Sequence, residues 1–151
     1  MKLDETDLKI LRILQNNARV SARAIAEEVY VSAPTVAARI ETMRREGVIR
    51  GYYTDVSPAA FGNTIRAYMD MEVTPGKRNE LYEFLRNCPQ VIECNRVTGE
   101  YSLLIELLFR NTDEMGKFIN QVQHYGRTQT QIVFSTVINH RGPAIPEDLP
   151  E

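Results

Sequence analysis

The spacing of apolar residues changes once along the chain, and this change limits the folds that the chain can adopt. Up to residue 50, apolar residues recur at helical spacing, as Val36, Ile40 and Met43 do. After Gly62, apolar and polar residues alternate, as they do in half-buried strands. The pattern therefore predicts two modules, a helical one and one built on a β-sheet, which together make an α+β protein.

The first 50 residues contain start and stop signals for three helices. Asp4, Ser21 and Ser32 are residue types that cap helix N-termini, and Gly47 is suited to end the third helix. About three residues join the second predicted helix to the third, which is the arrangement of a helix-turn-helix. This arrangement favours DNA binding, and a purely structural three-helix bundle is the alternative.

Charge is distributed unevenly along the chain, although the net charge of the whole chain is only −2. Residues 1–50 contain nine basic and seven acidic residues, a balance of +2. The remaining residues contain nine basic and thirteen acidic ones, a balance of −4. A mildly basic first module followed by an acidic one indicates that the two have different partners.

The second module shows the order strand, helix, strand twice. Strands are predicted over 65–73, 91–97, 101–109 and 128–137. One helix ends before Pro89, and the other begins at a cap formed by Asn111 or Thr112. This order is typical of a ferredoxin-like βαββαβ domain with both helices on one face of the sheet.

Composition divides the chain further. Tyr52 and Tyr53 follow the third helix and favour a short strand, while the end of the chain is rich in proline and lacks a core pattern. The predicted division is a helix-turn-helix domain (1–50), a linker strand (51–62), the ferredoxin-like domain (63–140) and a tail (141–151) that is a mobile or packed extension.

Four stretches, in this order and spacing, resemble the Lrp/AsnC family of leucine- and asparagine-responsive transcription regulators. They are LDETDLKILRILQNNARVS, AIAEEVYVSAPTVAARIETMRREGVIRGYY, PQVIECNRVTGEYSLLIEL and RTQTQIVFSTVI, and they span nearly the whole chain. The resemblance implies a winged helix-turn-helix that binds double-stranded DNA, followed by a ferredoxin-like domain for effector binding and oligomerisation. It also implies dimers that assemble further, often into octamers.

The second and third predicted helices present groups suited to DNA. Ser32 and the backbone at Ala33 form a helix N-terminus, whose free N–H groups favour a phosphate. Arg39 projects from the third helix, where it can contact a guanine or a phosphate. The resemblance supports Arg39, because the family keeps an arginine in its recognition helix. The candidate DNA-contact residues are Ser21, Arg23, Ser32, Ala33, Pro34, Thr35, Ala38, Arg39 and Arg50.

The resemblance places a small-molecule effector between dimers, near the turn that joins the two middle strands and near the start of the last strand. Gly99 permits positive φ in that turn, whose N–H groups can hold a carboxylate. Many members carry Asp where Ser102 stands, so Glu100 would have to pair with an ammonium group here. The alternative is a structural turn and a strand edge used for assembly. The candidate effector residues are Thr98, Gly99, Glu100, Tyr101, Ser102, Thr128 and Thr130.

Other classes of function lack the necessary residues. His124 and His140 lie outside metal-ligand and nucleophile motifs, and no phosphate loop or dinucleotide motif occurs. We therefore expect no enzyme, no metal and no cofactor apart from a possible amino-acid effector. No long apolar run and no signal-peptide pattern occur, so a cytoplasmic location is expected. The remaining alternative is a metabolite-sensing assembly module whose helical head binds a protein partner instead of DNA.

Overall fold

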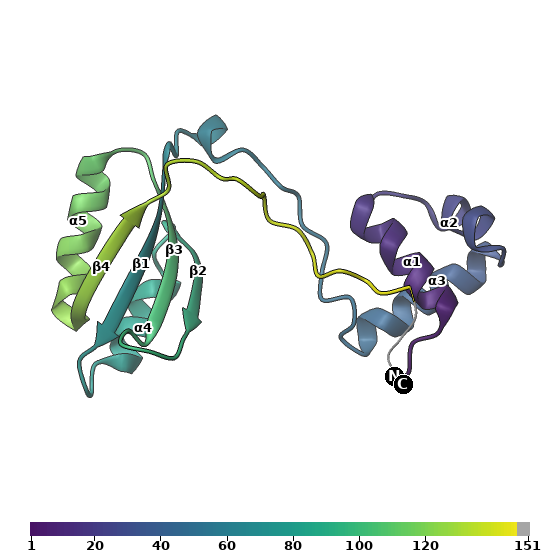
Figure 1. The fold of residues 1–151 in the computed structure, drawn as a ribbon, viewed down its shortest axis with the longest axis horizontal. Coiled ribbons are helices and arrows are strands. Elements are labelled where there is room, and N and C mark those ends of the chain that lie inside the picture. The colour runs from purple at the N-terminus through teal and green to yellow at the C-terminus, as the bar shows by residue number, and fades with distance from the viewer. Residues whose placement is uncertain (148–151) are drawn as a thin grey trace. The chain divides into compact units, whose positions relative to one another are not determined.

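The computed structural model describes residues 1–147 and divides the chain into two compact units (Figure 1). The first, called the head here, contains Met1–Thr54 together with the chain from Asn139 onward. The second, called the sheet unit, is Asp55–Ile138. No helix among the described residues is long and apolar enough to cross a membrane.

Three capped helices form the head: α1 (Glu5–Asn16), α2 (Ala22–Val29) and α3 (Ala33–Arg45). The three predicted caps are confirmed, because the side chains of Asp4, Ser21 and Ser32 each accept a hydrogen bond from the backbone N–H three residues later. The apolar stripes of the helices meet in one core, which consists of Ile10, Leu14, Ile25, Ala26, Val29, Val36 and Met43.

The linker contains no strand. The chain turns at Gly47, with φ of 75°, and residues 51–57 have no regular structure before a short 3-10 helix, η1 (Pro58–Phe61). The prediction of a linker strand over 51–62 is therefore wrong. A strand needs a hydrogen-bonded neighbour, and within residues 1–147 none is provided for Tyr52 and Tyr53.

The described part of the tail, residues 141–147, packs on α1. The Arg12 guanidinium donates to the carbonyl oxygens of Pro146 and Glu147 at 3.0 and 3.2 Å, and the Gln15 amide donates to that of Pro143 at 2.9 Å. The tail is thus a packed extension that belongs to the head, while residues 148–151 lie outside the described part of the chain.

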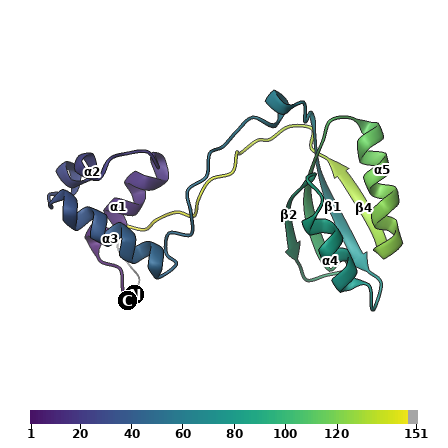
Figure 2. The same cartoon turned by 180° about the vertical axis from the view of Figure 1, so that it is seen from behind.

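The sheet unit has the predicted βαββαβ order. Its strands are β1 (Ile65–Val73), β2 (Val91–Arg96), β3 (Leu103–Phe109) and β4 (Gly126–Ile132), and its helices are α4 (Arg78–Arg86), α5 (Thr112–Val122) and the short 3-10 helix η2 (Gln123–Tyr125). The strands pair antiparallel in the order β2-β3-β1-β4. Figure 2 shows the sheet from the side that α4 covers.

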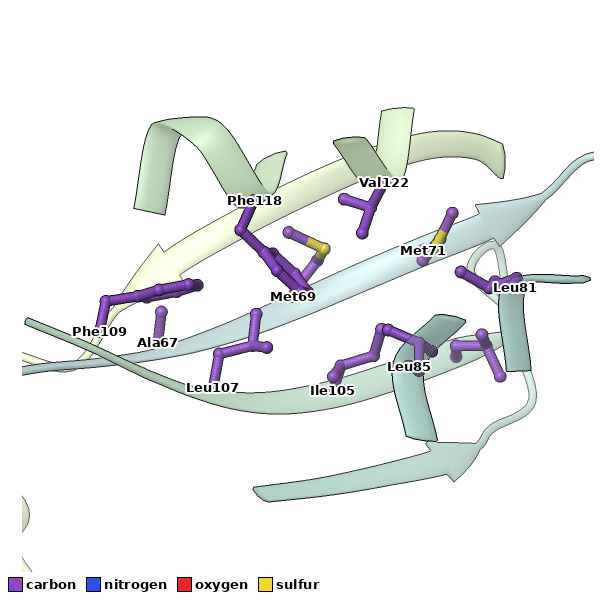
Figure 3. Close-up of a cluster of buried hydrophobic side chains, with 11 residues drawn as sticks. Ala67, Met69, Met71, Leu81, Leu85, Ile105, Leu107, Phe109, Phe118 and Val122 are labelled. Carbon is purple, nitrogen blue, oxygen red and sulfur yellow. The ribbon is translucent and has the colours of Figure 1, made fainter. Parts of the chain in front are cut away.

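Alternation along β1 separates two faces of the sheet. Ala67, Met69 and Met71 point toward the helices and are fully buried, whereas the residues between them point to the uncovered face. The core beneath α4 and α5 is almost entirely aliphatic and aromatic (Figure 3); it consists of Ala67, Met69, Met71, Leu81, Leu85, Leu103, Ile105, Leu107, Phe109, Phe118 and Val122.

The bounds of three strands differ from the prediction, although β2 differs by only one residue, since it ends at Arg96. The strand predicted over 128–137 is β4, which begins at Gly126 and ends at Ile132. The Val133 N–H still donates to the carbonyl of Arg66 at 2.8 Å, but β1 begins at Ile65, so later residues have no strand beside them. The strand predicted from residue 101 begins at Leu103, which leaves Tyr101 and Ser102 in the preceding turn.

Gly126 is required by the close approach of β4 to β1. A Cβ atom built at Gly126 collides with the carbonyl oxygen of Glu72, whereas one built at Gly116 in α5 meets no atom within 4 Å. We expect Gly126→Ala to lower the stability of the sheet unit by about 1–3 kcal/mol, because backbone must move to admit the methyl group. Gly116→Ala, the control, should raise it by about 0.5–1 kcal/mol. Amide hydrogen exchange of β1 in both variants measures these changes, and equal protection in the two would contradict the prediction.

Candidate functional site

The N-terminal half of α3 presents a surface of small side chains. Pro34, Thr35, Ala37 and Ala38 are exposed, while Val36 faces the core. Side chains of this size let a helix backbone approach base edges closely, and alanine and the threonine methyl group suit contact with a thymine methyl. The arrangement fits insertion of this half of α3 into a major groove.

The two serines of the helix-turn-helix are held in place by the caps. The Ser32 hydroxyl accepts from the Thr35 N–H at 3.2 Å and lies 2.7 Å from the Thr35 hydroxyl. The Ser21 hydroxyl accepts from the Ala24 N–H at 3.1 Å. Arg23 is exposed in the first turn of α2 and makes only a long contact of 3.4 Å with Glu27, while Arg50 is exposed beyond the C-terminal end of α3. The predicted DNA-contact residues thus lie on exposed parts of the head, with one notable difference at Arg39.

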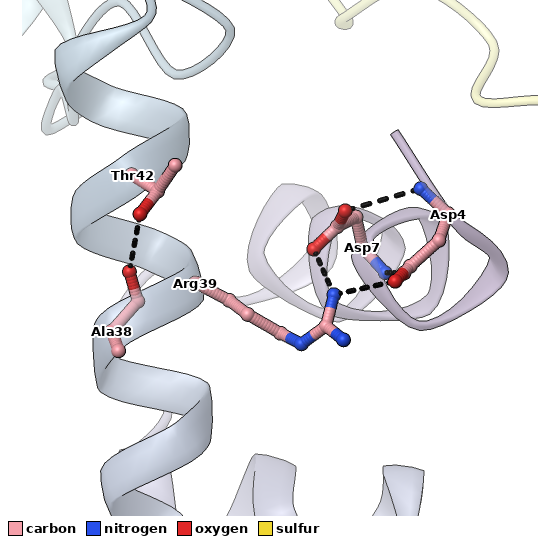
Figure 4. A network of polar contacts seen from close by, with 5 residues as sticks. All are labelled: Asp4, Asp7, Ala38, Arg39 and Thr42. Carbon is pink, nitrogen blue, oxygen red and sulfur yellow. Dashed lines mark hydrogen bonds and ion pairs between the residues drawn. The ribbon is translucent and has the colours of Figure 1, made fainter. Parts of the chain in front are cut away.

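Arg39 is turned toward α1 instead of standing free (Figure 4). One guanidinium nitrogen, Nη1, donates to Oδ2 of Asp4 at 2.7 Å and to Oδ1 of Asp7 at 2.8 Å. Asp4 and Asp7 also form a reciprocal capping box at the start of α1. The expectation that Arg39 simply projects toward DNA therefore needs correction, since part of its hydrogen-bonding capacity joins α3 to α1.

This contact compensates a buried charge. The Asp7 side chain is only 3% exposed, and Asp7 is the one charged residue among residues 1–147 that is buried. The Asp7 backbone N–H, and after it Arg39, lower the pKa of the Asp4 carboxyl. Hydrogen bonds to Asp7 and Asp4 raise the pKa of Arg39. Arg39 thus sets the position of α3 relative to α1.

Tyr30 is a feature of the helix-turn-helix that the sequence analysis missed. It ends α2 in the left-handed conformation, with φ of 57°, and its side chain is 93% exposed. This conformation costs a residue other than glycine about 1–2 kcal/mol. Tyrosine is not a residue type that signals positive φ, so only the shortness of the turn between α2 and α3 could have pointed to it.

The turn between β2 and β3 is fixed to the end of β1. The Ser102 N–H donates to the carbonyl of Met71 at 3.0 Å, and the Ser102 hydroxyl donates to the same oxygen at 3.4 Å. The Val97 N–H donates to the carbonyl of Ser102 at 3.0 Å, and Gly99 has a φ of 118°. Gly99 thus adopts the positive φ that the sequence analysis allowed for it. Ser102 is occupied by bonds within the chain.

A charged cluster lies beside this turn on the uncovered face of the sheet. Arg127 donates to Glu100 at 2.5 Å and to Glu72 at 3.2 Å, and its guanidinium carbon lies 5.1 Å from the centre of the Tyr101 ring. The Tyr101 hydroxyl donates to Oε1 of Gln129 at 3.2 Å. The hydrogen bond to Glu100 is the main cause that raises the pKa of Arg127.

Thr128 and Thr130 do not join this cluster. They pair with Met71 and Met69, whose side chains lie under the helices, so both threonines face the helix-covered side. Tyr101 and Gln129 lie on the other face, because Gln129 pairs with Asp70. The predicted effector residues are thus divided between two faces. Alternation along β4 places Arg127 and Gln129 on the face of the cluster. Arg127 was missed because the strand was predicted to start at Thr128, and Gln129 was missed because the two threonines chosen as effector residues lie on the opposite face.

The role assigned to Arg39 can be tested by its removal. Arg39→Ala should lower the stability of the head by about 1–3 kcal/mol, because it leaves the Asp7 carboxylate buried without its cation. Arg39→Ala combined with Asp7→Asn should cost less than Arg39→Ala alone, since the charge is then gone. Arg44→Ala removes an exposed pair with Glu41 and should cost no more than about 0.5 kcal/mol. Hydrogen exchange of α3 amides measures all three, and a double variant less stable than Arg39→Ala would refute the assignment.

Two family descriptions match this chain in the same order as its two units. "Winged helix-turn-helix DNA-binding" matches residues 3–50, and "Lrp/AsnC ligand binding domain" matches residues 66–143. The first description favours DNA over a protein as the partner of the head. The second covers just over half of the chain.

Two relatives of known name match most of this chain, and both are transcriptional regulators. The HTH-type transcriptional regulator Ptr1 of Methanocaldococcus jannaschii is 33% identical over 117 residues, which are 78% of this chain and 79% of Ptr1. The regulator FL11 of Pyrococcus horikoshii is 31% identical over 137 residues, 89% of this chain and 91% of FL11.

The E. coli AsnC structure is 28% identical, with a TM-score of 0.85 over 97% of this chain and all of that one. A transcriptional regulator of Neisseria meningitidis, solved as its complex with L-Met, is 27% identical, with a TM-score of 0.84 over 93% of this chain and 94% of that one. With both units matched in sequence and in fold, this chain belongs to the Lrp/AsnC family and is a DNA-binding transcriptional regulator.

Proposed function

We propose that the head reads a specific duplex sequence by placing the N-terminal half of α3 in the major groove. The observation that carries this proposal is the exposed, small-residue surface of α3 beside a capped helix N-terminus. The proposed contact residues are Ser21, Arg23, Ser32, Ala33, Pro34, Thr35, Ala38, Arg39 and Arg50.

These residues divide into two roles. Thr35 and Ala38 meet base edges, while Arg23 and Arg50 contact phosphates on either side. Arg39 has Nη1 bonded to Asp4 and Asp7, but its Nε and Nη2 make no hydrogen bond within residues 1–147. Those two groups remain for a phosphate, so Arg39 both positions α3 and contributes charge at the DNA surface.

The two roles predict different effects of mutation. Arg23→Ala should weaken binding to all sequences alike and reduce the slope of log K against log salt by about 1, because one phosphate contact is lost. Thr35→Ala should weaken binding to the selected operator by about 1–3 kcal/mol and leave binding to random duplex unchanged. The operator is first selected from a random DNA pool, and affinities are then measured by gel shift across a salt series.

Lys9→Ala is the matched control, because Lys9 on α1 is exposed, pairs with Glu5 at 2.6 Å and lies outside the proposed set. It removes the same charge as Arg23→Ala and should leave the salt slope unchanged. The proposal fails if Lys9→Ala and Arg23→Ala change the slope equally, or if Thr35→Ala binds the operator as well as the wild type.

We further propose that an amino acid is the effector and that it binds at the turn by exchanging with the ion pair of Glu100 and Arg127. A zwitterion offers an ammonium group to Glu100 and a carboxylate to Arg127. The single ion pair between Glu100 and Arg127 would then be replaced by two ion pairs, one from each side chain to the ligand. Both side chains are more than half exposed, so solvent screens their pair and it opens at little cost in free energy. The ligand-binding description and the L-Met complex of the Neisseria meningitidis protein support a small-molecule effector. The proposed residues are Thr98, Gly99, Glu100 and Tyr101 with Arg127 and Gln129.

We also propose that the chain forms dimers and that these dimers assemble into larger particles, up to an octamer. Leu104 and Leu108 lie on the sheet face that carries no helix, and each is only partly buried. A symmetric contact between two sheet units would cover them. Because the turn lies where the family resemblance places a contact between dimers, a bound effector would act by changing the balance between dimers and larger particles.

Calorimetric titration of the twenty amino acids tests the effector site. We expect one or a few to bind, and Arg127→Ala to weaken their binding about ten- to a hundredfold, because one charge-assisted contact is lost. Sedimentation of the same samples should show at least a dimer and a shift in particle size on binding. Arg110→Ala removes an exposed arginine elsewhere in the sheet unit and should change nothing. Amino-acid binding that survives Arg127→Ala, or a monomer in every sample, would contradict the proposal.

A further inference from the structure

A pocket separate from the charged cluster lies on the helix-covered side of the sheet. It has a volume of about 350 Å³ and is lined by Tyr82, Leu85, Arg86, Val91, Cys94, Arg96 and Leu103. It exists because the edge strand β2 is largely exposed, while β3 beside it is buried under the helices. The volume falls in the range of about 300–1,000 Å³ that is usual for small-molecule sites.

A bulge in β2 brings two of the lining residues to the same face of the sheet. Val91 pairs with Leu107 and Glu93 with Glu106, so one extra residue is inserted between them as a bulge. In a regular strand, residues three apart point to opposite faces. The bulge instead leaves Val91 and Cys94 on the same face, the one turned toward α4, where both line the pocket.

The charge of the lining is one-sided. Arg86 at the end of α4 and Arg96 at the end of β2 both contribute to the pocket, and no Asp or Glu does. Neither arginine forms an ion pair within residues 1–147, unlike Arg39 and Arg127. The remaining walls are mainly apolar, from Leu85, Val91 and Leu103. The pocket therefore combines an apolar interior with two arginines that have no ion-pair partner within residues 1–147.

We propose that this pocket binds a small carboxylate with an apolar branched or aromatic body, such as a 2-oxo acid, through Arg86 and Arg96. Arginine is suited to hold a carboxylate through two parallel hydrogen bonds. An ammonium group on the ligand is disfavoured, because two cations and no acid face it. The site thus selects a monoanion, whereas the turn on the other face, with Glu100 and Arg127, suits a zwitterion.

The proposal goes beyond the amino-acid response proposed above and does not use its residues. Arg96 and Leu103 flank the turn of residues 97–102 on the helix-covered side, while Arg127 and Tyr101 lie on the other face. A ligand in the pocket and an amino acid at the turn would therefore bind at chemically different sites of one domain. The two proposals can fail separately.

Cys94 allows a test that reports on the pocket itself. Its side chain is exposed and lines the pocket, and partial desolvation raises the pKa of its thiol. In a Cys88→Ala background, Cys94 is the one remaining cysteine. The rate at which N-ethylmaleimide modifies it is measured with and without 4-methyl-2-oxopentanoate, L-leucine or 3-methylbutylamine. These probes share nearly the same apolar body and differ in charge.

We expect 4-methyl-2-oxopentanoate to slow modification in a saturable manner, L-leucine to do so only at higher concentration, and the amine to have no effect. Arg86→Ala and Arg96→Ala should each raise the half-saturating concentration of the oxo acid about tenfold or more, since each removes a charge-assisted contact. Arg78→Ala is the matched control, because Arg78 begins the same helix, is exposed and does not line the pocket.

Several outcomes would overturn the proposal. Equal protection by all three probes, no protection by the oxo acid, or protection unchanged in both arginine variants would each do so. Modification that slows as protein concentration rises, with no probe present, would assign the pocket to a contact between copies of the chain and would also overturn it. Arg96→Gln, which keeps the aliphatic stem and a polar end but removes the charge, should reproduce Arg96→Ala and guards against loss of folding. DNA binding and amino-acid titration of the same variants show whether the functions proposed above stand independently.

Discussion

The central strand β1 determines which face of the sheet the side chains of its neighbouring strands occupy. It pairs with β3 on one side and β4 on the other, so its alternation is imposed on both neighbours. Met69 and Met71 face the helices, and the residues opposite them do so as well. Glu72 faces the other way, which places Arg127 opposite it on the uncovered face. A shift of one residue in this register would exchange the two faces and bury Arg127.

The head depends on a different interaction, the compensation of a buried carboxylate. Asp7 takes part in the capping box of α1 and is almost completely buried, so it requires a cation nearby. Arg39 supplies that cation from the middle of α3. The same guanidinium therefore links the helix that begins the head to the helix proposed to read DNA. Small exposed residues can occupy the side of α3 that is proposed to face DNA, because contacts elsewhere secure the orientation of the helix.

Local signals predicted most of this structure, and pairing partners account for what they missed. The caps at Asp4, Ser21 and Ser32 and the bounds of β1 depend on neighbours in sequence, so they could be predicted from residue types and spacing. The end of β4, the absence of a linker strand and the contact of Arg39 with Asp7 depend on which segments meet in space. The same holds for the two threonines of β4, whose face follows from pairing with Met69 and Met71. A bulge such as the one after Val91 has no local signature in these residues.

The turn between β2 and β3 separates the two proposed ligand sites, which differ in chemical preference, and is itself held firmly. Two hydrogen bonds from Ser102 to the Met71 carbonyl join it to β1, and a ligand on either face would have to break them to move the turn. A mixed-charge surface remains on one face and a cationic pocket on the other, and neither needs the turn to move. A ligand bound beside a fixed turn changes the charge and shape of the surface there. A neighbouring copy of the chain would then contact that changed surface. This favours transmission through assembly over a hinge within one sheet unit, because surface complementarity changes while the sheet keeps its register.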